Sequence, residues 1–168
     1  MRNFVKYIDR ISEWTGRIVK WLIFALIGAL IYEVIARYAF NRPSFWSYDV
    51  SYILYGAFFL LGAAFTLLVG GHVRIDVFYS RFSPRGRAII DLVCYLVFFF
   101  PVMAILLHKG IDFAQSSWEF GEGSAFSAWK PAIYPYKTVF PVAIFLLLIQ
   151  GVAEFLRNLV MVARKEQL

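Results

Sequence analysis

Charged and reactive side chains are both scarce in this chain of 168 residues. Aspartate, glutamate, lysine and arginine together make up 17% of it, against about 25% in an average soluble domain. One cysteine and two histidines provide neither an internal disulfide nor a cluster with the spacing of a metal site. The sequence also lacks a nucleophile–base pair and a glycine-rich phosphate loop. We therefore expect neither an enzyme nor a bound cofactor.

Hydrophobic residues, by contrast, are abundant. They make up 61% of the chain, whereas a soluble domain averages about 45–50%. One soluble core could not hide that much apolar surface, so the composition indicates a membrane protein in contact with lipid. The net charge of +6 would favour nucleic acid as the partner of a soluble protein. Here the basic residues cluster beside apolar runs, as topology signals do, and no nucleic-acid partner is expected.

Four apolar segments are each long enough to cross a bilayer as a helix, since roughly 20 residues span a hydrocarbon core of ~30 Å. They comprise residues 21–40, 49–70, 88–114 and 138–161. The other segments are short, so residues 1–168 form a single all-α membrane domain. Pro101 predicts a kink in the third span. Cys94, in the same span, is expected to be a buried small hydrophobe.

Residues 1–20 have the pattern of an amphipathic helix that lies in the membrane interface. Phe4, Ile8, Ile11 and Ile18 recur at helical spacing, with basic residues between them. No small-x-small cleavage site follows, so we expect an uncleaved anchor rather than a signal peptide.

The distribution of basic residues predicts which side of the membrane each segment faces. Four spans put both termini on one side, together with the loop between the second and third spans. Twelve of the 17 lysines and arginines lie on that side. The positive-inside rule therefore predicts cytoplasmic termini, with the long loop 115–136 on the opposite side.

Two ionisable residues interrupt the first span. Glu33 and Arg37 lie four residues apart with the glutamate first, which is the favourable order for a helical ion pair. Charges inside a membrane are costly and raise a functional hypothesis by default. A pair near a helix end can also simply neutralise itself or bind a neighbouring helix. We favour this packing role over an ion or proton role, and the sequence leaves open whether the two pair with each other or with another chain.

A stripe of small residues runs down the second span. Gly62, Thr66 and Gly70 recur every four residues, and such stripes allow the backbones of membrane helices to approach closely. The stripe predicts that a helix packs there, from either this chain or a partner.

Two alternatives come from other functional classes. A haem-bearing anchor of a redox complex needs axial ligands that face one plane. His72 and His108 should be separated by most of the ~30 Å core and cannot share one haem. His72 instead opens the segment HVRID, in which His72, Arg74 and Asp76 are expected to shape the loop. The second alternative, a self-contained small transporter, is weakened by the lack of an internal repeat.

The loop 115–136 is rich in aromatic and acidic residues. Its tryptophans could form an aromatic belt where the helices leave the bilayer. They could equally belong to a docking surface for a soluble partner, since aromatic residues dominate binding hot spots. The candidates are Trp118, Glu119, Glu122 and Trp129.

Several motifs, in this order and spacing, resemble the small membrane subunit of the tripartite ATP-independent periplasmic (TRAP) transporters. These are RYAFNRPSFW, LLGAA and GGHVRID around the second span, then SWEFGEGS, WKPAIYPYK and LLLIQGVAEFLRN. Together they cover the chain from Arg37 to about Asn158. One departure is that the family usually has an acidic pair after the tryptophan, whereas Tyr48 and Asp49 follow Trp46 here.

The resemblance implies a multi-pass protein of the bacterial inner membrane that binds a large multi-span permease subunit. A periplasmic solute-binding protein would deliver an organic acid, and sodium, bound on the large subunit, would drive its import. The small subunit would be a fixed scaffold for an elevator-type partner. By this analogy, subunit and helix packing is assigned to Glu33, Arg37, Trp46, Asp49, Gly62, Thr66 and Gly70. The four loop candidates would then contact the binding protein or the periplasmic face of the large subunit.

Overall fold

Helices make up most of this protein, whose computed structural model describes residues 2–71 and 82–164. They are α1 (Arg2–Val19), α2 (Leu22–Tyr38), α3 (Ser47–Leu68), α5 (Pro84–Cys94), a π-helical turn (Tyr95–Phe99), α6 (Phe100–Glu119) and α7 (Tyr134–Arg164). Four helical segments are long and apolar enough to cross a membrane. The predicted all-α, four-span membrane fold is confirmed.

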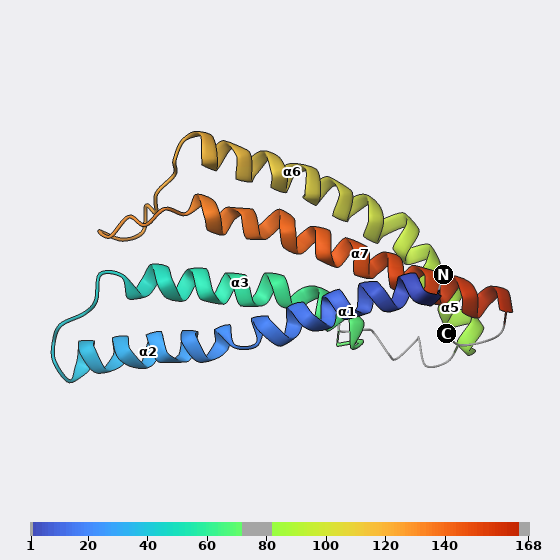
Figure 1. Cartoon of the computed structure of the whole chain (residues 1–168), viewed down its shortest axis with the longest axis horizontal. Helices are drawn as coiled ribbons and strands as arrows, with labels where there is room; N and C mark the ends of the chain where they lie inside the picture. The colour runs from blue at the N-terminus through green and yellow to red at the C-terminus, as the bar shows by residue number, and fades with distance from the viewer. Residues whose placement is uncertain (1, 72–81, 165–168) are drawn as a thin grey trace.

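The four spans lie side by side in the order α2, α3, α7, α6 (Figure 1). Each helix contacts its neighbour in this row, and α7 makes the most contacts because it also meets α1 and α5. The described ends of the chain, Arg2 and Arg164, lie at the same end of the layer, as an even number of spans requires. We call this the terminal end. The opposite end, formed by the connections 39–46 and 120–133, is called the loop end.

The third and fourth helices are longer than the predicted spans 88–114 and 138–161. α5 to α6 covers residues 84–119, and α7 begins at Tyr134. The long loop therefore comprises residues 120–133 rather than 115–136. α6 continues through the polar residues after Ala114 and ends at Glu119, two residues before Gly121 adopts a positive φ of +56°.

Most of the apolar surface of this layer is not buried by the chain itself. Leu26 is the one buried residue of α2. Between Ile89 and Lys109, Tyr95 alone is buried. The expectation that Cys94 is buried was wrong, because this part of the third span contacts α7 along one narrow side and Cys94 faces away. Such a surface needs lipid or another protein around it.

Helix α1 is amphipathic, as predicted, and packs against α3 and α7. Val5, Ile8 and Val19 are buried in that contact, whereas Tyr7 and Trp14 are exposed. Bonds between residues three apart, such as Trp21 N–H to Ile18 O (3.1 Å), join α1 to α2 in a tight turn. How α1 lies relative to the membrane surface stays a prediction.

An irregular turn accompanies Pro101, where the sequence predicts a kink. Proline lacks an N–H and its ring clashes with the carbonyl four residues earlier. The preceding residues form a π-helical turn, in which Phe100 N–H bonds to Tyr95 O, five residues back. Such turns are one of the established causes of bends in helices.

Glycines provide the close approaches between helices, each beneath an aromatic ring. A Cβ placed on Gly16 of α1 would lie 2.5 Å from Cγ of Phe65, and one on Gly151 of α7 would lie 2.2 Å from Cε1 of Phe99. Gly56 and Gly110 lie in the same way beneath Tyr136 and Phe140. Helices of this chain approach one another closely at these four positions rather than along the predicted stripe.

Replacing Gly16 by alanine should therefore separate α1 from α3. The new methyl group would overlap Cβ and Cγ of Phe65, which lie close to the backbone and cannot swing away, at a cost of about 1–3 kcal/mol. A lower melting temperature in detergent would report this loss.

Gly28→Ala is the matched control, since a Cβ there meets nothing within 4 Å. It should leave the melting temperature unchanged or raise it, because alanine favours a helix over glycine by roughly 1 kcal/mol. Equal melting temperatures for the two variants would contradict the seating of Phe65 on Gly16.

Candidate functional site

The long loop at the loop end is a fixed structure rather than a flexible linker. At the end of α6, Gly121 N–H bonds to Trp118 O (3.3 Å) and Glu122 N–H to Ser117 O (3.1 Å). This is the glycine-terminated motif that satisfies the last carbonyls of a helix. Farther on, an antiparallel bridge pairs Gly123 with Ala132. The loop is thus folded back on itself between α6 and α7.

Asp49, in the first turn of α3, fastens this loop to the layer. Its side chain is buried and accepts hydrogen bonds from the hydroxyls of Ser124 (2.6 Å) and Ser127. A buried carboxylate is tolerated only with such partners. The two serine hydroxyls in turn accept from the N–H groups of Phe126 and Trp129. One carboxylate therefore orders a loop about 75 residues away in sequence.

Glu122 and Lys137 form an ion pair that ties the loop to the first turns of α7. The same oxygen of Glu122, Oε2, also accepts from the Ser117 hydroxyl (2.8 Å). The ammonium of Lys137 lies 4.1 Å from the ring centroid of Phe113, a cation–π contact. Lys137 and Ser117 together hold the pKa of Glu122 below its usual value, so this carboxylate stays ionised.

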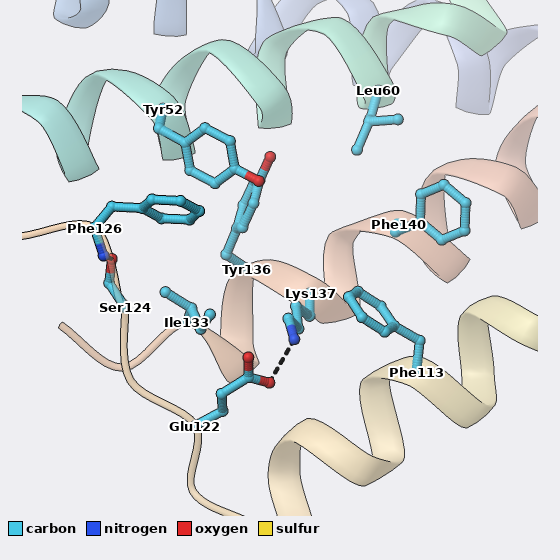
Figure 2. Close-up of a pocket in the computed structure, with 10 residues that line it drawn as sticks. All are labelled: Tyr52, Leu60, Phe113, Glu122, Ser124, Phe126, Ile133, Tyr136, Lys137 and Phe140. Carbon is cyan, nitrogen blue, oxygen red and sulfur yellow. Dashed lines mark hydrogen bonds and ion pairs between the residues drawn. The ribbon is translucent and has the colours of Figure 1, made fainter. Parts of the chain in front are cut away.

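A cavity of about 300 Å³ lies between α3, α6, α7 and the loop (Figure 2). Glu122, Ser124 and Lys137 line it on the loop side. Aromatic rings form most of its walls, and Leu60 lies in the wall contributed by α3. The rings belong to Tyr52, Phe113, Phe126, Tyr136 and Phe140.

The four docking candidates have different environments. Trp118 donates from Nε1 to the Thr138 hydroxyl (2.9 Å) and packs on Tyr134, yet remains half exposed. Glu119 and Trp129 are exposed. Glu122, by contrast, is held in the internal ion pair. Docking to another protein stays a prediction for all four, and Trp118, Glu119 and Trp129 are the exposed ones.

Glu33 and Arg37 pair with each other within α2. The guanidinium donates to Oε1 of Glu33, and Oε2 accepts from the backbone N–H (3.1 Å) and the hydroxyl of Ser44. The pair thus fixes the connection 39–46 within this chain, and contact of either residue with another chain stays a prediction. Next to it, Trp46 stacks on Tyr32 (5.3 Å between ring centroids) and joins α3 to α2.

A second polar cluster, which sequence reasoning missed, holds α1 on α7 near the terminal end. The fully buried Ser12 hydroxyl donates to Gln150 Oε1 (2.7 Å), and Gln150 Nε2 donates to Asp9 (3.2 Å). Arg157 bridges Asp9 and Glu154. The signals for it in the sequence were the polar residues at helical spacing in 1–20 and the pair Gln150 and Glu154 inside the apolar fourth span.

The predicted stripe on α3 has open space beside Gly62, where a Cβ would meet nothing within 4 Å. Thr66 is half-buried and bonds back to Gly62 O (3.0 Å). Gly70 follows the end of α3 with φ +68°. Of the two options for the stripe, packing within the described chain is therefore excluded at Gly62. His72, Arg74 and Asp76 lie outside the described residues.

Comparison with known proteins identifies the family. A model of the DctQ component of tripartite ATP-independent periplasmic transporters matches residues 26–161, most of the chain. The chain belongs to this family. It is therefore a component of a transporter and not an enzyme, and with its four apolar helices it is a multi-pass membrane protein.

Three named relatives are each 27% identical to this chain over the residues that match. One is the sialic acid TRAP transporter permease protein SiaT of Haemophilus influenzae, where the match covers 64% of this chain but 17% of the relative. The others, from Vibrio cholerae, are the C4-dicarboxylate TRAP transporter small permease protein DctQ (55% and 43%) and the sialic acid small permease protein SiaQ (56% and 54%). The matches thus span about half or less of each relative's length.

Removing the carboxylate of Asp49 should release the loop. Asp49→Ala leaves the hydroxyls of Ser124 and Ser127 without their acceptor, which should cost about 1–3 kcal/mol locally. We expect faster hydrogen–deuterium exchange across 120–133 and faster chymotryptic cleavage after the exposed Phe126.

Glu119→Ala is the control, because this exposed carboxylate lies just before the loop. It should leave both rates unchanged. An Asp49→Ala protein with the exchange pattern of the wild type would show that the loop is ordered by other contacts.

Proposed function

We propose that this chain is the small permease subunit of a TRAP transporter and works beside a large multi-span permease subunit. The observation that carries this is the match to SiaT: a segment like this chain makes up 17% of that permease protein, so most of that polypeptide lies outside the match. A separate small subunit needs an equivalent partner in the same membrane. The membership of this chain in a transporter family favours this function over that of a redox anchor.

The solute is proposed to be an organic acid. Two relatives are named for sialic acid and one for C4-dicarboxylates, and all of these are carboxylates. A periplasmic solute-binding protein would deliver the solute, and sodium would drive its uptake. We assign the solute and sodium sites to the large subunit, because most of the polar side chains described within the helices already bond to other groups of this chain.

The role of this chain is then that of a scaffold. A row of four helices leaves wide apolar faces for a partner and for lipid. Its connections are fixed by polar contacts of the half-buried Glu33 and the buried Asp49. A rigid, broad element of this kind would hold an elevator-type partner in place while the partner moves.

The charge distribution gives the proposed orientation. With the terminal end in the cytoplasm of a bacterial inner membrane, twelve of the 17 basic residues lie on the inner side. The loop end then faces the periplasm, where a solute-binding protein would reach Glu119 and Trp129.

The Gly62 face of α3 is proposed to receive a helix of the large subunit. Because this glycine is open in the described chain, Gly62→Leu should leave the fold intact and block close helix approach. A mild-detergent pull-down through a tag after Leu168 should then recover much less of the large subunit than with the wild type.

Gly28→Leu makes the same change at an open position on α2 and is the control. It should keep the partner. Undiminished recovery with Gly62→Leu would remove this face from the subunit interface, and a wild-type chain recovered alone would contradict the proposed function itself.

Docking of the binding protein can be tested at Glu119. Glu119→Lys reverses an exposed charge at the loop end and should lower the association rate, because charges at a rim steer encounter. We expect a several-fold higher KM for solute delivered by the binding protein, with an unchanged maximal rate.

Glu13→Lys makes the same reversal at the other end of the layer, where Glu13 pairs with Arg17 on the surface. It should have no effect on this KM. Equal KM values for wild type and Glu119→Lys would place docking elsewhere.

A further inference from the structure

The cavity at the loop end has one polar side and one apolar side. Its charged groups, Glu122 and Lys137, and the hydroxyl of Ser124 come from the loop and from the start of α7. The hydroxyls of Tyr52 and Tyr136 are further polar groups in its lining (Figure 2). Leu60, two turns along α3 from Tyr52, and Phe140 lie deeper in the layer (Figure 2). A ligand that fills this cavity must therefore have a polar head and an apolar body.

Neighbouring aromatic residues indicate the depth of the cavity in the membrane. Trp118, Tyr134 and Tyr136 lie at the same end of α6 and α7, and Trp118 satisfies its N–H on Thr138. Tryptophan and tyrosine concentrate where a bilayer changes from headgroups to acyl chains. The polar side of the cavity is then level with lipid headgroups, and the Leu60 side is level with hydrocarbon.

The charges in the cavity match a ligand that carries both signs. The two bonds to Glu122 from within the chain both end on Oε2, so among the described residues Oε1 accepts none. The ammonium of Lys137 has three donors, of which one bonds to Glu122. An anionic group could bind Lys137 while a protonated amine binds Glu122 Oε1, and the net charge of the site would remain zero.

We propose that this cavity binds a phospholipid with a zwitterionic aminophosphate headgroup. The phosphate accepts from Lys137, the primary ammonium donates to Glu122, and the upper part of an acyl chain lies among the aromatic rings toward Leu60. A volume of about 300 Å³ holds the headgroup and the start of one chain, while the rest of the lipid stays in the bilayer. The lipid would fill the space beneath the loop and hold α3 and α6 at their distance across α7.

A lipid fits these features better than a soluble organic acid or a partner side chain. A small carboxylate would satisfy Lys137 but bring a second negative charge beside Glu122. A side chain from a partner has no reason to match both the paired charges and the change in polarity with depth. The inference does not depend on the proposed transport function.

Native mass spectrometry of the full-length protein in mild detergent tests the proposal. Phosphatidylethanolamine, phosphatidylcholine and phosphatidylglycerol are added separately at equal concentrations. Phosphatidylethanolamine should be retained roughly tenfold better than the others, because the trimethylammonium of choline has no N–H for Glu122 and glycerol carries no positive charge. Equal retention of all three lipids would overturn the proposal and indicate ordinary surrounding lipid.

Two variants locate the site. Glu122→Gln should reduce retention of phosphatidylethanolamine to that of phosphatidylcholine, whereas Glu119→Gln, the matched control outside the cavity, should keep the preference. Leu60→Trp should fill the apolar side and lower retention of phosphatidylethanolamine without touching the ion pair. A preference that survives Glu122→Gln, or that Glu119→Gln removes equally, would overturn the assignment to this cavity.

Recovery of the large subunit in the same preparations is scored separately. A lipid preference without a large partner would contradict the proposed function and leave the lipid site standing. Recovery of a large partner without a lipid preference would overturn the lipid site and leave the proposed function standing.

Discussion

A row of helices one layer thick can bury only the sides along which neighbours touch, and this limit governs the rest of the structure. Leu26 alone is buried in α2, and Tyr95 alone between Ile89 and Lys109. In water such a layer would expose too much apolar surface, but in a bilayer the lipid tails are as apolar as the side chains. Cohesion must then come from close contact and from polar bonds, and both are found along the seams between the helices.

The seams use two kinds of contact. In the first, rings such as Phe65 and Phe99 lie on glycines, so that backbones approach without polar groups. In the second, buried polar bonds join the helices, from Asp49 at the loop end and from Gln150 nearer the termini. Each of these polar groups is paired, as a low-dielectric surrounding requires. The layer is therefore fastened at both ends.

Local patterns made much of this predictable. Hydropathy gave the four spans, and spacing gave the Glu33–Arg37 pair, because both depend on residues near one another in sequence. The partners of Asp49 and Gln150 could not be found in this way, since they lie 75 and 138 residues away and are serines, which are common and unspecific. Glycines posed a related problem: Gly56 and Gly62 look alike in the sequence, yet one lies beneath Tyr136 and the other is open. The difference depends on which helix is the neighbour, and no local pattern records that.

The π-helical turn at Tyr95–Phe99 has a consequence for the length of the third span. A π turn holds one residue more than an α turn, so it acts as a one-residue insertion that the helix absorbs locally. Deleting one residue there would restore regular α geometry and leave Gly110 facing Phe140. The same deletion in the regular part of α6 before Gly110 would instead rotate everything beyond it by about 100° and turn Gly110 away from Phe140. The π-helical turn is therefore the place where this span can lose one residue without changing the face that α6 presents to the loop.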